Sequence, residues 1–531
     1  MKIIKLSSLT LLSALVLASC SATKSTLAPV VSIENIALKN SKINENDLKR
    51  WSHLDILKDT IPGMSVDKAY SELIKNKKGT KVIVGVVDSG VDIEHPDLQG
   101  VIWTNTKEIP GNGIDDDNNG FIDDVHGWNF LGDIAGENLE LTRIVKKGDD
   151  GSADYKKAKA EFDTKIQEAT AQKQQFDFIY NADKAIRTEL KKDNYTLEDL
   201  KTLNSSNPLV NQVKPRFIQI LTSIPKAEFD EQITEAKDHF DNELEFNLNL
   251  NFNGRKVVGD NVDDLTDTKY GNNNVIGPDK KGALHGTHVA GIIAQVRNNG
   301  LGGDGVANNV EIMAVRAVPD GDEYDKDIAL GIRYAVDNGA KVINGSFGKS
   351  YSPHKEWVYD ALKYAASKDV LVVLAAGNEG TDLDTEDRFP NDRDASGEIS
   401  DNVIKIGALN TVYGSDLVAN FSNYGTEDVD VFAPGVQIYA TIPDNQYKYL
   451  AGTSMASPNV AGVAALIRSY YPTLTATQVK QILMESGIPT NIEVVLAGEK
   501  GNKRSFSKAS KSGKMVNAYN ALLMAEKMAK K

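Results

Sequence analysis

Two of the seven histidines in this 531-residue chain stand three residues apart, in the stretch LHGTHVAGIIA (residues 284–294). The stretch has the small-residue, apolar pattern of a helix, and His285 and His288 fall where that helix would begin. The zinc-binding pattern H-E-x-x-H is absent, and no acidic residue lies between the two histidines. His288 is readily explained as a histidine hydrogen-bonded inside the fold, whereas a chemical role for His285 requires partners from elsewhere in the chain.

Three other stretches offer such partners. Asp88 directly follows the β-branched run VIVGVV (residues 82–87), and acids at the carboxyl ends of buried parallel strands lie where open α/β sheets place their active sites. Ser454 lies near the start of the helical pattern AGTSMASPNVAGVAALI (residues 451–467), where free N–H groups and the helix dipole favour developing negative charge. Asn378, in AAGNEG, ends a further buried run. Alone, each has an ordinary explanation, such as a turn aspartate or an N-cap serine.

The elements that carry these residues indicate an α/β fold. Continuous apolar runs, typical of strands buried on both faces, occur at residues 82–87, 310–318, 341–347, 370–377 and 402–409. Helical patterns separate several of them, such as KDIALGIRYAVDNGA, which ends in a glycine C-cap signal at Gly339. Strands alternating with helices predict a parallel central sheet.

The motifs VVDSG, HGTHVAGIIA, VINGSFG, AAGNEG and GTSMASP occur in this order, and together they resemble the subtilisin-like serine proteases, the subtilase family or peptidase family S8. The resemblance extends from about Trp51 to Ala525 and includes the closing stretch GKMVNAYNAL. It implies a three-layer α/β fold with a parallel central sheet. We expect a peptidase domain at residues 46–528.

The resemblance also implies the role of each motif residue. Ser454 would be the nucleophile, His285 its general base, and Asp88 the carboxylate that orients His285. Asn378 would donate its side-chain amide to the oxyanion, and His288 would be structural. Segments that bind the substrate as an added strand are expected at Gly345, Ser346, Phe347, Gly348, Ala375, Ala376 and Gly377. The family often has methionine where Gly345 stands, so the shape of the pocket stays open.

The region between Asp88 and His285 departs from compact members of the family. Residues 136–245 are rich in Lys, Glu, Asp and Gln, and they lack any run typical of a buried strand. Apolar residues recur there at helical spacing, as in Phe162, Ile166 and Ala169, so we expect a helical insertion whose apolar faces pack on one another. Near the active-site rim it could restrict substrates. Alternatively, it docks a protein partner.

An acidic loop, GNGIDDDNNGFIDDVHGWNF (residues 111–130), precedes the insertion. It matches the first half of the calcium-loop pattern D-x-[DN]-x-[DN]-G, but His126 stands where the closing glutamate is expected. A solvated acidic turn is the alternative. We expect a structural Ca²⁺ site with ligands drawn from Asp115, Asp117, Asn119, Phe121, Asp123 and Asp124.

The N-terminus and the composition bear on location and partners. Residues 1–19 have two lysines and a short apolar run before Cys20, the only cysteine, which resembles the lipobox of bacterial lipoproteins. We expect lipidation at Cys20, a tether over residues 20–45, and an outer-membrane lipoprotein of a Gram-negative bacterium. An ordinary cleaved signal is the alternative. The net charge of −14 argues against a nucleic-acid partner. Peptide or protein substrates are expected; a catalytically silent peptide-binding protein is the rival hypothesis.

Overall fold

The computed structural model describes Ile33 and residues 43–530. The expected signal peptide (residues 1–19), Cys20 and most of the expected tether lie outside the described residues. Within the described part, no helix has both the length and the apolar character needed to cross a membrane.

A nine-stranded sheet forms the centre of the body, in the order β12-β15-β9-β8-β5-β4-β1-β3-β2. All neighbouring strands pair in parallel except β12 and β15. The strands are β1 (Val82–Asp88), β2 (Gly127–Asn129), β3 (Val310–Arg316), β4 (Val342–Gly345), β5 (Leu371–Ala375), β8 (Val403–Leu409), β9 (Val431–Pro434), β12 (Ile488–Pro489) and β15 (Lys514–Met515). Each of the five predicted strands is present, so the prediction of a mostly parallel sheet is confirmed.

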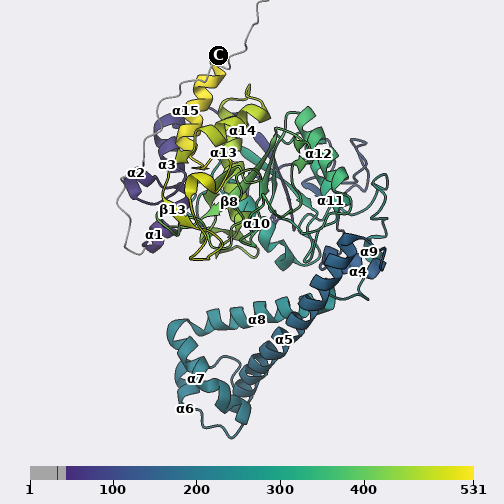
Figure 1. Cartoon of the computed structure of the whole chain (residues 1–531), viewed down its shortest axis with the longest axis vertical. Coiled ribbons are helices and arrows are strands. Elements are labelled where there is room, and N and C mark those ends of the chain that lie inside the picture. The colour runs from purple at the N-terminus through teal and green to yellow at the C-terminus, as the bar shows by residue number, and fades with distance from the viewer. Residues whose placement is uncertain (1–32, 34–42, 531) are drawn as a thin grey trace, which may run out of the picture.

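Both faces of the sheet are covered, because successive side chains point to opposite faces and are apolar on both. In β1, Val84 and Val86 join one core, and Val87 joins the other. The first core is packed by α10 (Leu284–Ala294), α13 (Thr453–Tyr470), α14 (Ala476–Glu485) and α15 (Ala518–Ala529). The second is packed by α11 (Asp325–Asp337) and α12 (Lys355–Ser367) (Figure 1). The predicted three-layer α/β architecture is confirmed.

Short helices and two-stranded antiparallel sheets surround this body. Before β1 lie α1 (Glu45–Leu48), η1 (Trp51–His53), α2 (Ile56–Asp59), α3 (Val66–Ala69) and η2 (Tyr70–Ile74). Three antiparallel pairs lie outside the main sheet: β6 (Arg393–Asp394) with β7 (Gly397–Glu398), β10 (Ile438–Ile442) with β11 (Gln446–Leu450), and β13 (Glu493–Val495) with β14 (Lys503–Ser505). The remaining short helices are η3 (Pro96–Leu98), α9 (Arg255–Val258), η5 (Lys280–Ala283) and η6 (Phe506–Lys508).

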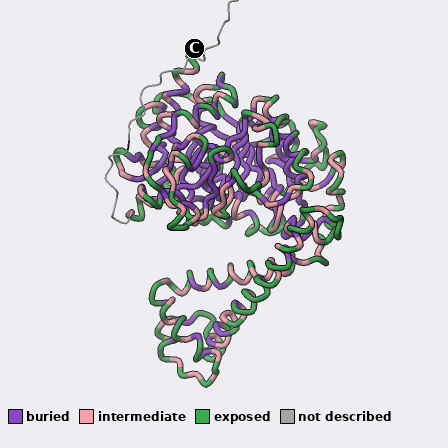
Figure 2. The backbone as a smooth tube through the Cα atoms, viewed as in Figure 1, coloured by how far each residue is buried: buried purple, intermediate pink, exposed green. Residues whose placement is uncertain are grey.

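A helical arm projects from the body, as Figure 1 shows in teal. It consists of α4 (Glu140–Lys147), α5 (Ala153–Leu190), α6 (Leu197–Thr202), α7 (Pro208–Ser223), α8 (Lys226–Asn242) and η4 (Glu243–Asn247). Far more of its surface is exposed than in the body (Figure 2). The buried apolar residues at its far end, among them Phe176, Phe217 and Phe229, form a cluster of their own. Nearer the base, Phe162 and Ala169 cluster with Tyr351 of the body. The expectation that the apolar stripes of the insertion pack on one another is therefore confirmed.

Several ionic contacts join the arm to the body. At its base, the buried Glu140 carboxylate lies 2.5 Å from the Arg143 guanidinium and 2.9 Å from the Lys349 ammonium. Further out, the Lys448 ammonium on β11 contacts Glu231, at 2.9 Å, and Glu235 on α8. These exposed ion pairs link α8 to β11.

Candidate active site

Asp88 and His285 meet at the carboxyl edge of the central sheet. Asp88 is the last residue of β1 and is 1% exposed, and His285 lies in the first turn of α10. The Nδ1 atom of His285 lies 2.7 Å from the Asp88 Oδ1 atom, which also accepts from the Ser89 backbone N–H at 2.7 Å. A Cβ atom at Gly286 would lie 2.1 Å from the Gly90 carbonyl oxygen, so glycine is what lets α10 begin so close to β1.

The electrostatics favour a charged imidazolium at His285. Burial alone would lower the pKa of His285, but the charge of Asp88 and its hydrogen bond outweigh burial, so that the pKa is raised above 6.5. The imidazole is nevertheless 36% exposed, which leaves its other edge open to a reacting group. This arrangement suits a base that takes up a proton and holds it while a carboxylate stabilises the charge.

His288 has a different environment, one turn further along α10. It is fully buried, and its Nε2 atom lies 3.1 Å from the Ile438 carbonyl oxygen and 3.0 Å from that of Lys448. Burial lowers its pKa to about 4, so the ring is neutral near pH 7. His288 therefore links α10 to the hairpin of β10 and β11 and takes no part in the Asp88 pair.

Ser454 is held at the N-terminal end of α13 by contacts with the segment that follows β4. The Ser454 hydroxyl donates to the Ser346 carbonyl oxygen at 3.3 Å, and the Ser346 hydroxyl donates to the Ser454 carbonyl oxygen at 2.9 Å. Asn344 adds a second link, since it donates to the Ser346 hydroxyl at 2.9 Å and accepts from Ser457 at 2.8 Å. Because β4 pairs with β1, these contacts bring Ser454 to the same edge of the sheet as Asp88.

Two N–H donors converge in front of Ser454. The Asn378 Oδ1 atom accepts from the Thr453 backbone N–H at 2.8 Å and from the Thr453 hydroxyl at 3.0 Å, which fixes the orientation of the amide group. A Cβ atom built on Gly452 would lie 3.5 Å from Asn378 Nδ2 and 3.6 Å from the Ser454 backbone nitrogen. Both donors therefore border one small space, as a site for a developing oxyanion requires.

A cavity of about 210 Å³ opens beside Ser454 and Asn378. Five of the residues expected to bind substrate line it: Phe347, Gly348, Ala375, Ala376 and Gly377. The other two support it from behind, because Gly345 is buried within β4 and the Ser346 side chain bonds to α13. Arg388, Phe389, Pro390 and Lys405 also line the cavity, and the sequence motifs did not identify them.

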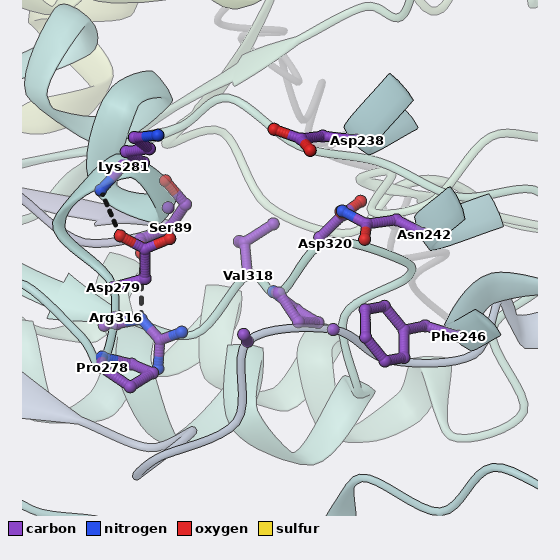
Figure 3. Close-up of a pocket in the computed structure, with 14 residues that line it drawn as sticks. Ser89, Asp238, Asn242, Phe246, Pro278, Asp279, Lys281, Arg316, Val318 and Asp320 are labelled. Carbon is purple, nitrogen blue, oxygen red and sulfur yellow. Dashed lines mark hydrogen bonds between the residues drawn. The ribbon is translucent and has the colours of Figure 1, made fainter. Parts of the chain in front are cut away.

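A second cavity, of about 460 Å³, lies between the arm and the site (Figure 3). Asp238, Asn242 and Phe246 line it from the arm, and Ser89 and Lys281 line it from the segments next to Asp88 and His285. The end of α8 therefore faces the rim of the site.

The acidic loop gathers three carboxylates. Oxygen atoms of Glu108, Asp115 and Asp117 lie within 4.8 Å of one another. Motif spacing pointed to Asp115 and Asp117 but missed Glu108, which precedes the loop. Mutual repulsion among three such groups favours a hard cation between them.

The expected ligands Asp123 and Asp124 lie outside this group of three carboxylates, whereas Asn119 and Phe121 have no carboxylate and stay predicted ligands. Asp123 accepts the backbone N–H groups of residues 111, 112 and 113, and Asp124 accepts from Asn105, Asn119 and Tyr334. The pKa of Asp124 is raised to about 6, mainly by burial. The Asn119 Oδ1 atom accepts from the Phe121 N–H, and the Phe121 ring packs edge-on against Tyr334. These residues hold the loop in shape and fix it to the body.

Comparison with known proteins gives the family. The sequence model described as the subtilase family, Peptidase_S8, matches residues 79–507. A thermophilic serine proteinase of Bacillus sp. (strain AK1) is 49% identical over 186 residues, which are 35% of this chain and 42% of that protein. Subtilisin DY of Bacillus licheniformis is 41% identical over 39% of this chain and 71% of that protein. Thermitase of Thermoactinomyces vulgaris is 40% identical over 40% of this chain and 68% of that protein.

A solved protease structure from Pseudoalteromonas arctica matches 45% of this chain and 70% of that chain, with 31% identity and a TM-score of 0.37. The family model covers most of the described body, including the segments that carry Asp88, His285, Asn378 and Ser454. The chain belongs to the subtilase family of serine proteases.

Proposed function

We propose that this protein is a serine endopeptidase that hydrolyses peptide bonds through an acyl-enzyme on Ser454. The observation that carries the proposal is the Asp88–His285 pair, 2.7 Å apart at the sheet edge where the first turn of α13 carries Ser454. Membership of the subtilase family supports the same chemistry.

Each of these residues has a defined role in the reaction. His285 accepts the proton of the Ser454 hydroxyl as the oxygen attacks the substrate carbonyl, and Asp88 stabilises the imidazolium that forms. The Asn378 amide and the Ser454 backbone N–H donate to the carbonyl oxygen as it becomes negative. His285 then gives its proton to the leaving amine, and water releases the acyl group by the same steps in reverse.

A fluorophosphonate probe tests the proposal directly, since it labels only an activated serine. We expect the wild-type protein to be labelled and to cleave casein, and we expect the folded S454A variant to do neither. The rival hypothesis, a silent peptide-binding protein, requires the wild type to remain unlabelled while it still binds peptides. Membership of the subtilase family and the similarity to a named serine proteinase disfavour it.

Ca²⁺ is the proposed ligand of Glu108, Asp115 and Asp117. The fit rests on three carboxylates within 4.8 Å, the oxygen donors that Ca²⁺ prefers. A bound ion would brace the loop ahead of β2 and would take no part in the chemistry. We expect CaCl₂ to raise the melting temperature and EGTA to lower it, and the D115N/D117N variant to lose both responses. Asp263→Asn, on the exposed surface, is the matched control. Equal melting temperatures in CaCl₂ and EGTA would contradict the proposed Ca²⁺ site.

A lipid anchor at Cys20 is proposed from the motif LASC alone. It would hold the enzyme in the envelope of a Gram-negative bacterium, at the outer membrane. Growth with an alkyne-modified fatty acid should label the wild-type protein and leave C20A unlabelled. Recovery of unlabelled wild type in the soluble fraction would support an ordinary cleaved signal instead.

The arm is proposed to restrict access to the site. The ion pairs of Lys448 with Glu231 and Glu235 hold α8 near the rim. Replacing residues 149–242 by a short Gly/Ser linker keeps α4, whose Glu140 binds Lys349 at the base. We expect this variant to cleave a folded protein faster and a small peptide at the wild-type rate. Unchanged cleavage of both substrates would favour the alternative, a docking role for a protein partner.

A further inference from the structure

The cavity of about 210 Å³ beside Ser454 carries three charged side chains on its walls: Glu379, Arg388 and Lys405. Its position next to the nucleophile and Asn378 places it where the side chain preceding the cleaved bond would enter. The charge that remains unpaired in the cavity should therefore select that side chain.

Two of the three charges neutralise each other. The Arg388 Nε atom lies 3.7 Å from the Glu379 Oε2 atom, and Arg388 also lies 3.5 Å from Glu386. Glu379 further accepts from the Asn423 side-chain amide at 2.6 Å. Arg388 and Glu379 thus each have an opposite charge within 4.0 Å.

Lys405 differs from both. It lies in the middle of β8, paired with Leu374 of β5, and the whole residue is 2% exposed. Among the residues that the structure describes, no carboxylate oxygen lies within 4.0 Å of its ammonium group. The Lys405 ammonium nitrogen is not among the fully buried polar atoms that lack a hydrogen-bond partner, so part of its surface remains accessible. Lys405 is one of the residues that line the cavity beside Ser454.

Acids behind the sheet offer a competing role for Lys405, although the cations that lie within 4.0 Å of them are others. Asp430 lies 3.9 Å from the Lys480 ammonium, and Asp428 lies 3.7 Å from Arg393. Burial raises the pKa of Asp428, and the charge of Lys405 is the largest influence that lowers it, ahead of that of Arg393. These acids thus influence Lys405 from a distance without forming an ion pair with it.

We propose that Lys405 makes this cavity selective for a carboxylate, so that the enzyme cleaves after glutamate or aspartate. The inference rests on the proposed peptidase function and adds a substrate class to it. A buried ammonium without a partner gains a charge-assisted hydrogen bond from an entering carboxylate, and a neutral amide of the same shape cannot replace that gain.

Peptides that differ only in glutamate or glutamine before the cleaved bond test the proposal. We expect wild-type kcat/KM to be about 10- to 100-fold higher for glutamate, the range for a hydrogen bond to a charged group. In K405M this preference should disappear. The matched control is K480M, which removes another buried lysine beside the same acids but outside the cavity, and it should keep the preference. A wild-type ratio near one, or a higher rate for phenylalanine than for glutamate, would overturn the proposal whether or not K405M folds.

A binding measurement separates this proposal from the peptidase function itself. Folded S454A should bind a product peptide that ends in glutamate at least about tenfold more tightly than one that ends in glutamine. Equal binding, or none, would overturn the selectivity. Loss of fluorophosphonate labelling in the wild type would instead overturn the peptidase function, and the two failures are therefore distinguishable.

Discussion

Replacing Asp88 by asparagine should change both the rate and its pH dependence, because the carboxylate both raises the pKa of His285 and stabilises its charged form. In the native protein the charge of Asp88 outweighs the effect of burial on that pKa. The D88N variant keeps burial and loses the charge, so the pKa of His285 should fall below that of the native enzyme. The reaction needs a neutral His285, so the acidic limb of the pH profile should move to lower pH.

The size of the rate loss follows from the geometry. The Asp88 oxygen lies 2.7 Å from His285 Nδ1, which puts the centres of charge about 4 Å apart. At an effective dielectric constant of about 20, two such charges attract by about 4 kcal/mol. The imidazole is 36% exposed, and screening reduces this value, so we expect kcat to fall about 10²- to 10³-fold. Asparagine can also turn its NH₂ group toward Nδ1 and select the wrong tautomer, which would deepen the loss.

The assay is kcat/KM for a small peptide between pH 5 and 9. The same exchange at Asp263, which lies 2.9 Å from His354 on the surface, serves as the control and should leave the profile unchanged. If D88N lowered the rate but kept the acidic limb at its native pH, then Asp88 would not control the charge of His285. That result would refute the electrostatic reasoning.

Three further predictions concern neighbouring groups. Asn378→Ala removes one of two oxyanion donors and should lower kcat by roughly 10²- to 10³-fold, the loss known for subtilisin, with little change in KM; an equal rise in KM would argue for a substrate-binding role. His288 is neutral in the fold, where its pKa is about 4, whereas in the unfolded chain its pKa is about 6.5. As the pH falls below about 6.5, the unfolded chain therefore binds this proton before the folded protein does. Stability should therefore be complete above pH 6.5 and decline toward pH 4 by on the order of 3 kcal/mol from this group, and H288Q should flatten the decline in denaturant titrations. Lys448→Glu should repel Glu231 and Glu235, release α8, and speed cleavage of a folded protein more than that of a peptide; equal rates for both substrates would count against a closing contact.

The predictable part of the fold is the part buried on both faces. The strands β1, β3, β4, β5 and β8 consist of apolar runs, because helices cover both sides of the sheet. The strands at its edges gave no such signal. The three-residue strand β2 lies within the last part of the acidic loop, and β15 pairs with β9 only through Met515 and Phe432. Elements this short form because their neighbours are in place, and no local pattern encodes them.

The site, like the fold, has a part that the sequence predicts and a part that it does not. Motifs identified Asp88, His285, Asn378 and Ser454, since each lies in a local pattern of its own. The contacts that position them join residues far apart in the chain, such as Asn344 with Ser457, which are separated by 113 positions. A single sequence does not show such pairings, and neither did it show that Glu108 joins the acids of the loop.

Three charged residues interrupt the apolar strands near the site, and their surroundings distinguish their roles. Asp88 is paired with His285. Arg316, at the end of β3, donates to the carbonyl oxygens of Ser89, Gly132 and Ile134, so its charge is used within the fold. Lys405, in the run NVIKIGAL, has no such partner and borders the cavity beside the nucleophile. A charge in a buried strand costs free energy unless it is compensated. Because the fold places no carboxylate within 4.0 Å of the Lys405 ammonium, we expect a carboxylate that enters the cavity to form that ion pair, and a lysine in a core strand becomes evidence about the substrate.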